Sequence, residues 1–240
     1  MLAGCSIQNT TMFSIRHANR MGALLFLWSF YPIFGQSNTT VYWQPAVAVN
    51  YKISETYSHN FSMLNRNYLY NEGNSQFNVR HIDLAHFSDV QITDRQRLAI
   101  GILYRFRNMF EEQENELRLT QQYNLQLKPY VVRFGHRVRA EQRITNSATV
   151  HRFRYRFGVD FPLQGEKLDV GETYFIGTIE SLLSIAKNTK PEYDSRLSLF
   201  FGWQMNENTK LQLGSEYRME DFTNSRETVI FVLSSLIFSL

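Results

Sequence analysis

Arginine recurs at every second position in several stretches of this chain, and this spacing is the feature best suited to carry chemistry. Between residues 151 and 161, Arg152, Arg154 and Arg156 alternate with aromatic side chains. In an extended strand these arginines share one face, whereas a helix would scatter them around its axis. A row of guanidinium groups either favours anions or forms a ladder of ion pairs with carboxylates. Both interpretations stay open at the level of sequence.

The same alternation predicts a larger set of charged residues on one common face. Carboxylates at Glu116, Glu141, Asp160 and Glu220 fall on that face as potential ion-pair partners. The predicted lumen-lining charged residues are Arg105, Arg107, Arg118, Arg133, Arg137, Arg139, Arg152, Arg154, Arg156, Glu180, Arg196, Glu216 and Arg218.

The elements that position these charges are predicted to be strands. Aromatic residues make up 15% of the 240-residue chain, a composition that favours strands and argues against disorder. About eleven segments alternate between apolar and polar residues, most of them long enough to cross a bilayer as tilted strands. The clear segments are 97–107, 116–127, 130–141, 151–161, 196–205 and 210–220, and the weaker ones are 40–53, 56–70, 78–92, 171–187 and 226–240.

We expect these strands to form an all-β, closed, antiparallel up-and-down transmembrane β-barrel. Bacterial barrels usually have an even number of strands, so about twelve are predicted, with ten as the alternative. Pro45 interrupts the first segment and marks the place where a strand is most easily miscounted. The fold class implies that the apolar face meets lipid and the arginine face is enclosed.

The N-terminal region resembles a secretory signal peptide. Arg16, His17 and Arg20 precede the apolar run 22–34, which is too short to span a membrane as a helix. We predict a signal peptide over 1–35, with the true start at Met12 or Met21, and a β-barrel domain over 36–240. The single cysteine, Cys5, falls in the removed part, so the mature chain would lack disulfides.

The connections between strands separate into two groups by length. Counting back from the C-terminus puts short turns at 54–55, 93–94, 128–129 and 206–209 on the periplasmic side. The longer connections at 71–76, 110–115 and 188–194 would face outward. The connection 164–171 is the exception, because it is long and falls on the periplasmic side.

Three runs of residues support a family resemblance. They are HRFRYRFGVDFPL at 151–163, the stretch 196–202, and NTKLQLGSEYR at 208–218, with Glu180 in an intervening strand. Together they resemble the domain-of-unknown-function 2490 family of predicted outer-membrane β-barrel proteins from Gram-negative bacteria. The resemblance implies a barrel in the outer membrane and brings no catalytic residues.

An enzymatic alternative rests on histidines at outward positions. Alternation puts His59, His86 and His136 on the apolar face, and Ser88 shares the face of His86. A hydrolase would need a serine and a histidine in contact, oriented by a third polar group. Interface histidines explain the same pattern. No GxSxG, HExxH, phosphate-loop or calcium-loop motif occurs, and His81 with Asp83 is too little to indicate a metal site.

The predicted function is an outer-membrane β-barrel of unassigned biochemical role, structural or for passive transport through an arginine-rich polar lumen. The alternatives are an outer-membrane lipid hydrolase or acyl-modifying enzyme, and a soluble secreted ligand-binding β-barrel. We expect no catalytic residues, no metal and no cofactors. The expected partners are outer-membrane lipid and the outer-membrane assembly machinery. The formal net charge of +3 does not indicate a nucleic-acid partner.

Overall fold

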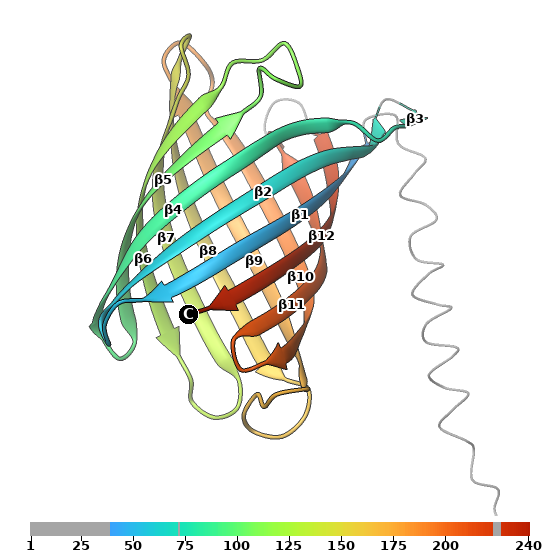
Figure 1. Ribbon diagram of the computed structural model, residues 1–240. Helices are drawn as coiled ribbons and strands as arrows, with labels where there is room; N and C mark the ends of the chain where they lie inside the picture. Colours follow the sequence, from blue (N-terminus) through green and yellow to red (C-terminus); the bar gives the residue numbers. More distant parts are fainter. Residues whose placement is uncertain (1–38, 72, 223–226) are drawn as a thin grey trace, which may run out of the picture. The chain divides into compact units, whose positions relative to one another are not determined.

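The chain folds into a barrel of long, tilted strands joined mostly by short connections (Figure 1). The computed structural model describes residues 39–71, 73–222 and 227–240. The strands are β1 Thr39–Lys52, β2 Tyr57–Asn71, β3 Asn74–Ser75, β4 Val79–Thr93, β5 Gln96–Phe106, β6 Glu116–Leu127, β7 Arg133–Ile144, β8 Thr149–Pro162, β9 Thr173–Ala186, β10 Glu192–Asn206, β11 Thr209–Glu220 and β12 Glu227–Ser239. The predicted all-β, closed-barrel fold is confirmed. The predicted signal peptide lies outside the described residues and stays a prediction.

In the part of the chain that the structure describes, no helix is long and apolar enough to cross a bilayer.

The barrel closes through a parallel strand pair, which differs from the all-antiparallel closure expected from the sequence. Neighbouring wall strands pair antiparallel from β1 to β12, and the ring closes where β1 lies parallel to β12, from Thr39↔Thr228 to Asn50↔Ser239. The extra strand β3 pairs only with β2, through Tyr70↔Ser75 and Asn71↔Asn74, and stands outside the wall. Eleven strands therefore form the wall, and an odd number of alternating strands leaves the first and the last pointing the same way.

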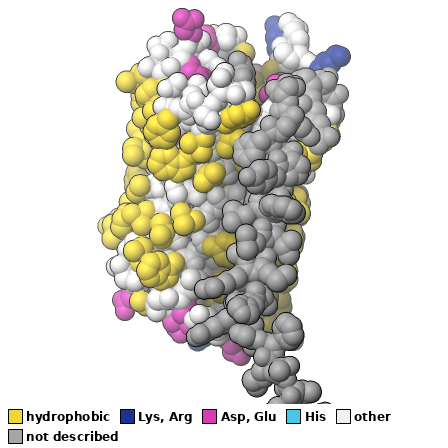
Figure 2. All heavy atoms as spheres, turned by 90° about the vertical axis from the view of Figure 1, so that its right-hand side faces the viewer, with side chains coloured by type: hydrophobic (Ala, Val, Ile, Leu, Met, Phe, Trp, Pro, Cys, Tyr) yellow, Lys and Arg dark blue, Asp and Glu magenta, His cyan; other side chains and the backbone are white. Residues whose placement is uncertain are grey.

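The outer face of the wall is apolar. From β5 to β11, every Lys, Arg, Asp and Glu of a strand lies on the same face as the buried residues Arg105, Glu116 and Glu180. The opposite face presents large apolar side chains, among them Ile100 at 67% exposure and Phe201 at 60%. Figure 2 shows such side chains spread over the visible side of the barrel, with acidic groups gathered at its two ends. Side chains in a strand point alternately to the two faces. The spacing of charged and apolar residues at every second position therefore separates them between the inside and the outside of the barrel.

The connections lie at two rims, grouped as the sequence predicted. The last residue, Leu240, donates its N–H to the Asn50 carbonyl and accepts from the Lys52 N–H, at 2.8 and 2.9 Å. This C-terminal rim also holds the connections 53–56, 94–95, 128–132, 163–172 and 207–208. The opposite rim holds 107–115, 145–148 and 187–191, together with the β2–β4 connection that contains β3. Which rim faces the periplasm stays a prediction.

Aromatic rings lie over glycines on the inner face. Phe87 is paired across the sheet with Gly101, and Tyr174 with Gly202. A Cβ added to either glycine would collide with the ring of its partner. The missing side chain therefore lets each ring lie against the neighbouring strand. These contacts favour the observed register of β4 with β5 and of β9 with β10.

A small apolar cluster occupies the interior next to the seam between β1 and β12. Tyr42, Val229, Phe231 and Leu233 are buried together, and Phe231 is fully buried. The rings of Tyr42 and Phe231 stack with their centroids 5.1 Å apart. The interior is therefore not uniformly polar, because β12 turns apolar residues inward.

Candidate functional site

The barrel encloses a charged cavity with a volume of about 620 Å³. Eleven of its lining residues are arginines and seven are acidic. The arginines are Arg66, Arg80, Arg105, Arg107, Arg118, Arg143, Arg152, Arg154, Arg156, Arg196 and Arg218. Positive charge is thus in excess on the cavity wall.

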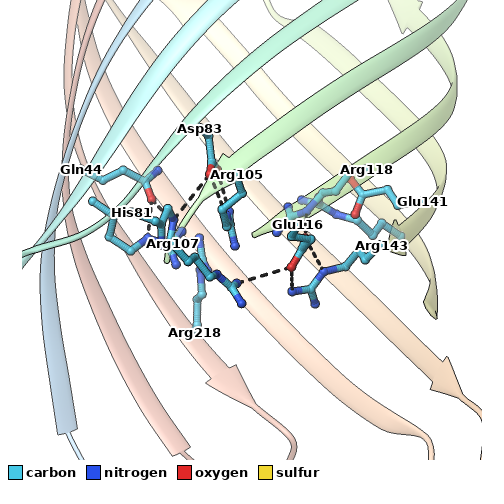
Figure 3. Close-up of polar contacts among 12 residues, drawn as sticks. Gln44, His81, Asp83, Arg105, Arg107, Glu116, Arg118, Glu141, Arg143 and Arg218 are labelled. Atoms are coloured by element: carbon cyan, nitrogen blue, oxygen red, sulfur yellow. Dashed lines mark hydrogen bonds and ion pairs between the residues drawn. The ribbon is translucent and has the colours of Figure 1, made fainter. Parts of the chain in front are cut away.

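Glu116 on β6 is shared by three arginines (Figure 3). Arg143 on β7 donates two hydrogen bonds to its carboxylate, from Nε at 2.9 Å and from Nη2 at 2.7 Å. Arg118 contacts the same carboxylate, and Arg107 lies 3.5 Å from it. The Glu116 side chain is almost fully buried, so its charge is neutralised by guanidinium groups and not by water.

A second shared carboxylate, Glu180 on β9, is contacted by arginines from both neighbouring strands, β8 and β10. Arg154 and Arg156 on β8 reach it at 2.6 and 2.9 Å, and Arg196 on β10 lies at 3.6 Å. Arg154 also donates to Glu141 on β7 at 3.0 Å. The resulting chain of ion pairs runs across β7, β8, β9 and β10 inside the barrel and ties those strands together.

Arginines and aromatic rings meet beside the seam. The guanidinium of Arg218 lies 3.9 Å from the ring centroid of Phe231, and that of Arg66 lies 4.7 Å from the same ring. Arg80 lies over Tyr42 and contacts its hydroxyl. These cation–π contacts hold the guanidinium planes without neutralising their charge.

Three inner arginines are held by neutral acceptors. Arg66 donates from Nε and Nη2 to the amide oxygen of Gln44, at 3.0 and 2.8 Å. Arg137 donates to the amide oxygen of Asn124 at 2.9 Å, and Arg152 donates to the Ser184 hydroxyl at 3.0 Å. An amide or a hydroxyl orients a guanidinium but leaves its full positive charge available to an anion.

The predicted lumen-lining residues fall into three groups. Nine of them line the large cavity: Arg105, Arg107, Arg118, Arg152, Arg154, Arg156, Arg196, Glu216 and Arg218. Arg133 and Arg137 line a smaller cavity of about 220 Å³, toward the C-terminal rim, that shares Arg156 with the first. Glu180 belongs to the ion-pair chain described above. Arg139 extends that chain, because it lies 3.3 Å from Glu141. Their functional role stays a prediction.

Three cavity arginines were not predicted. Arg143 lies on the expected inner face of β7, and simply extending the alternation by two residues would have included it. Arg66 and Arg80 flank a bulge between β2 and β4, where the register shifts at Arg66/Asn67 and Arg80 has no partner across the sheet. A bulge interrupts strict alternation, so periodicity could not assign Arg80 to the interior.

The two residues considered for a metal site lie together in the interior. His81 Nε2 lies 3.8 Å from Asp83 Oδ1, and both side chains are buried. Asp83 is occupied by Arg105, which donates two hydrogen bonds of 2.6 Å. Among the described residues, no group of three or more His, Cys, Asp or Glu side chains could hold a metal ion.

The outward histidines occupy two separate places on the wall. His59 lies in contact with both His86 and Ser88. His136 instead lies 2.8 Å from the Tyr155 hydroxyl, on β7 and β8.

The fold and its interior define a closed β-barrel with an apolar outer face and an arginine-rich cavity. A family model, described as a protein of unknown function (DUF2490), matches residues 41–229. The chain therefore belongs to this family, in agreement with the resemblance seen in the sequence. No curated protein matches the chain.

Proposed function

We propose that this protein is a β-barrel of a Gram-negative outer membrane whose interior binds small anions and lets them pass. The observation that carries the proposal is the separation of charge by face. From β5 to β11 all charged strand residues share the inner face, and the outer face is apolar.

Membrane placement follows from the cost of the alternative. A soluble barrel with this outer face would expose many large apolar side chains to water, at about 25 cal/mol for each Å². In lipid the same face is favourable, and the closed ring leaves no unpaired sheet edge. Export through a signal peptide over 1–35 and insertion by the outer-membrane assembly machinery belong to the same proposal.

The preference for anions follows from the charge balance of the interior. Arginines outnumber acidic residues on the cavity wall, and Arg66, Arg137 and Arg152 are held by neutral acceptors. Rings or clusters of arginine favour anions in pores. The ion pairs at Glu116 and Glu180 have a different role, because they hold neighbouring strands together.

The test is a planar bilayer recording of the purified, folded chain under a gradient of KCl. We expect conductance with a reversal potential that indicates chloride selectivity, reduced in Arg66→Gln and Arg152→Gln. Lys187→Gln removes the same charge from the connection at the opposite rim and is the matched control. A folded barrel that never conducts would indicate a purely structural interior.

The two remaining alternatives have their own readouts. Recovery of the chain in the soluble periplasmic fraction without detergent would favour a secreted ligand-binding barrel. Release of fatty acid from phospholipid by the wild-type chain, lost in His86→Ala, would favour the lipid-modifying enzyme.

A further inference from the structure

Four polar side chains form a connected cluster on the largely apolar outer face. His59 Nδ1 on β2 lies 2.9 Å from His86 Nε2 on β4 and 3.3 Å from the Ser88 hydroxyl. The Ser88 hydroxyl lies 3.3 Å from the hydroxyl of Tyr57, the first residue of β2. The register between β2 and β4 creates this cluster, because it pairs His59 with Ser88 and Phe61 with His86.

Two apolar grooves meet at His86. One has a volume of about 590 Å³ and crosses β1, β2, β4 and β5, with Phe61, Met63 and Leu84 in its lining. The other has a volume of about 370 Å³ and crosses β4, β5 and β6, with Ile100 and Leu119 in its lining. Ser88 lines the second groove beside His86. The polar cluster thus reaches, through His86, the place where the two apolar grooves meet.

The imidazole rings are held in place by their neighbours. His86 stacks on Phe61 with ring centroids 4.6 Å apart, and Tyr57 packs edge-on against His59 at 4.9 Å. Polar groups facing hydrocarbon cost free energy unless they are hydrogen-bonded. The contacts within the cluster use Nδ1 of His59 and Nε2 of His86, so the second nitrogen of each imidazole is left to meet a polar ligand.

The hydrogen-bond geometry favours binding over acyl transfer. In a serine hydrolase the base histidine uses one nitrogen for the serine and the other for an orienting group. Here Ser88 and His86 both approach the same atom, Nδ1 of His59. They compete for one nitrogen, so His86 does not orient His59 as a general base for Ser88.

We propose that this cluster is a binding site for a glycerophospholipid, with its phosphate and ester oxygens on the cluster and its two acyl chains in the two grooves. The imidazole N–H groups and the two hydroxyls supply donors for phosphate and ester oxygens. The inference rests on the proposed membrane location, because only there does the outer face meet lipid.

The chain offers a matched control on the same outer face. His136 and Tyr155 also form an outward polar contact, but neither residue lines either of the two apolar grooves. Loss of His136 removes a histidine from the wall without changing the proposed site.

The experiment measures retention of a defined lipid by the intact, folded chain in detergent. Dioleoyl phosphatidylglycerol is titrated, and bound lipid is read by native mass spectrometry. We expect one lipid retained by wild type and by His136→Phe, and at least about tenfold weaker retention in the His59→Phe/His86→Phe variant. Phenylalanine keeps an aromatic ring at each position and removes only the polar nitrogens, at a slightly larger volume, and heat-modifiable migration on gels confirms that each variant is folded.

Two outcomes would overturn the inference. One is equal retention by wild type and the double variant, and the other is equal loss in His136→Phe. Dioleoylglycerol, which lacks the phosphate, should bind at least about tenfold more weakly than the phospholipid if the cluster recognises phosphate, and equal binding would contradict that role. A chain that needs no detergent to stay in solution would instead refute the membrane location itself, which separates the two failures.

Discussion

Glu116 on β6 and Arg143 on β7 are joined by two parallel hydrogen bonds inside the barrel, and the same carboxylate also contacts Arg118 and Arg107. One buried carboxylate is thus contacted by three guanidinium groups. Removing the Glu116 carboxylate would leave several guanidinium groups buried without their partner, and unpaired buried charges are strongly destabilising.

We therefore predict that Glu116→Gln destabilises the barrel by about 3 kcal/mol or more. The measurement is the midpoint of urea unfolding of the chain refolded in detergent or liposomes. Glu112→Gln is the control, because Glu112 is exposed in the connection just before β6. An unchanged midpoint for Glu116→Gln would mean that the arginines find other acceptors.

A second prediction concerns the glycine beneath Tyr174. Gly202→Ala places a Cβ against the Tyr174 ring and should cost about 1–3 kcal/mol of unfolding free energy through overpacking. Gly135→Ala is the matched control, since its added Cβ has no atom within 4 Å. Adding Tyr174→Ala to Gly202→Ala should recover part of the loss. A purely additive double variant would show that the ring and the glycine do not interact.

The third prediction tests the parallel seam by cross-linking. Ala46 on β1 is paired with Ser235 on β12 on the inner face. In a Cys5→Ser background, Ala46→Cys with Ser235→Cys should form a disulfide on mild oxidation, because paired Cα atoms are within the distance a disulfide spans. Ala46→Cys with Ser234→Cys should not, since adjacent side chains point to opposite faces. The reverse preference would exclude this register.

The fourth prediction is a pH dependence at the opposite rim. The backbone N–H of Ser147 donates to Glu114 at 3.0 Å and its hydroxyl donates at 2.8 Å, and these bonds lower the pKa of Glu114. A carboxyl with a lowered pKa stabilises the folded state above its unfolded pKa, and this contribution is lost as the pH falls through the folded pKa.

Amide hydrogen exchange at Ser147 should therefore accelerate below about pH 4, after correction for the intrinsic rate. In Glu114→Gln the corrected rate should not respond to pH in this range. A wild-type rate that is equally insensitive to pH would show that the contact between the two connections does not form in solution.

Side-chain direction was largely predictable from the chain itself. In a strand each residue points opposite to its neighbours, so the alternation around Arg105, Arg118 and Arg154 assigned them to one face without knowledge of the fold. The closed all-β architecture followed from many such segments in succession. Regular alternation is a local property, and local properties can be read from a sequence.

Three features depended on the tertiary structure, because each arises from contacts between distant residues. The odd number of wall strands and the parallel pairing of β1 with β12 depend on how the ring closes, and no single segment of the sequence encodes this closure. The bulge at Arg66/Asn67 changes the direction of Arg80, since one unmatched residue reverses the alternation. Finally, the contact between His59 and His86 exists only in the observed register of β2 and β4, and a shift of one residue would separate them.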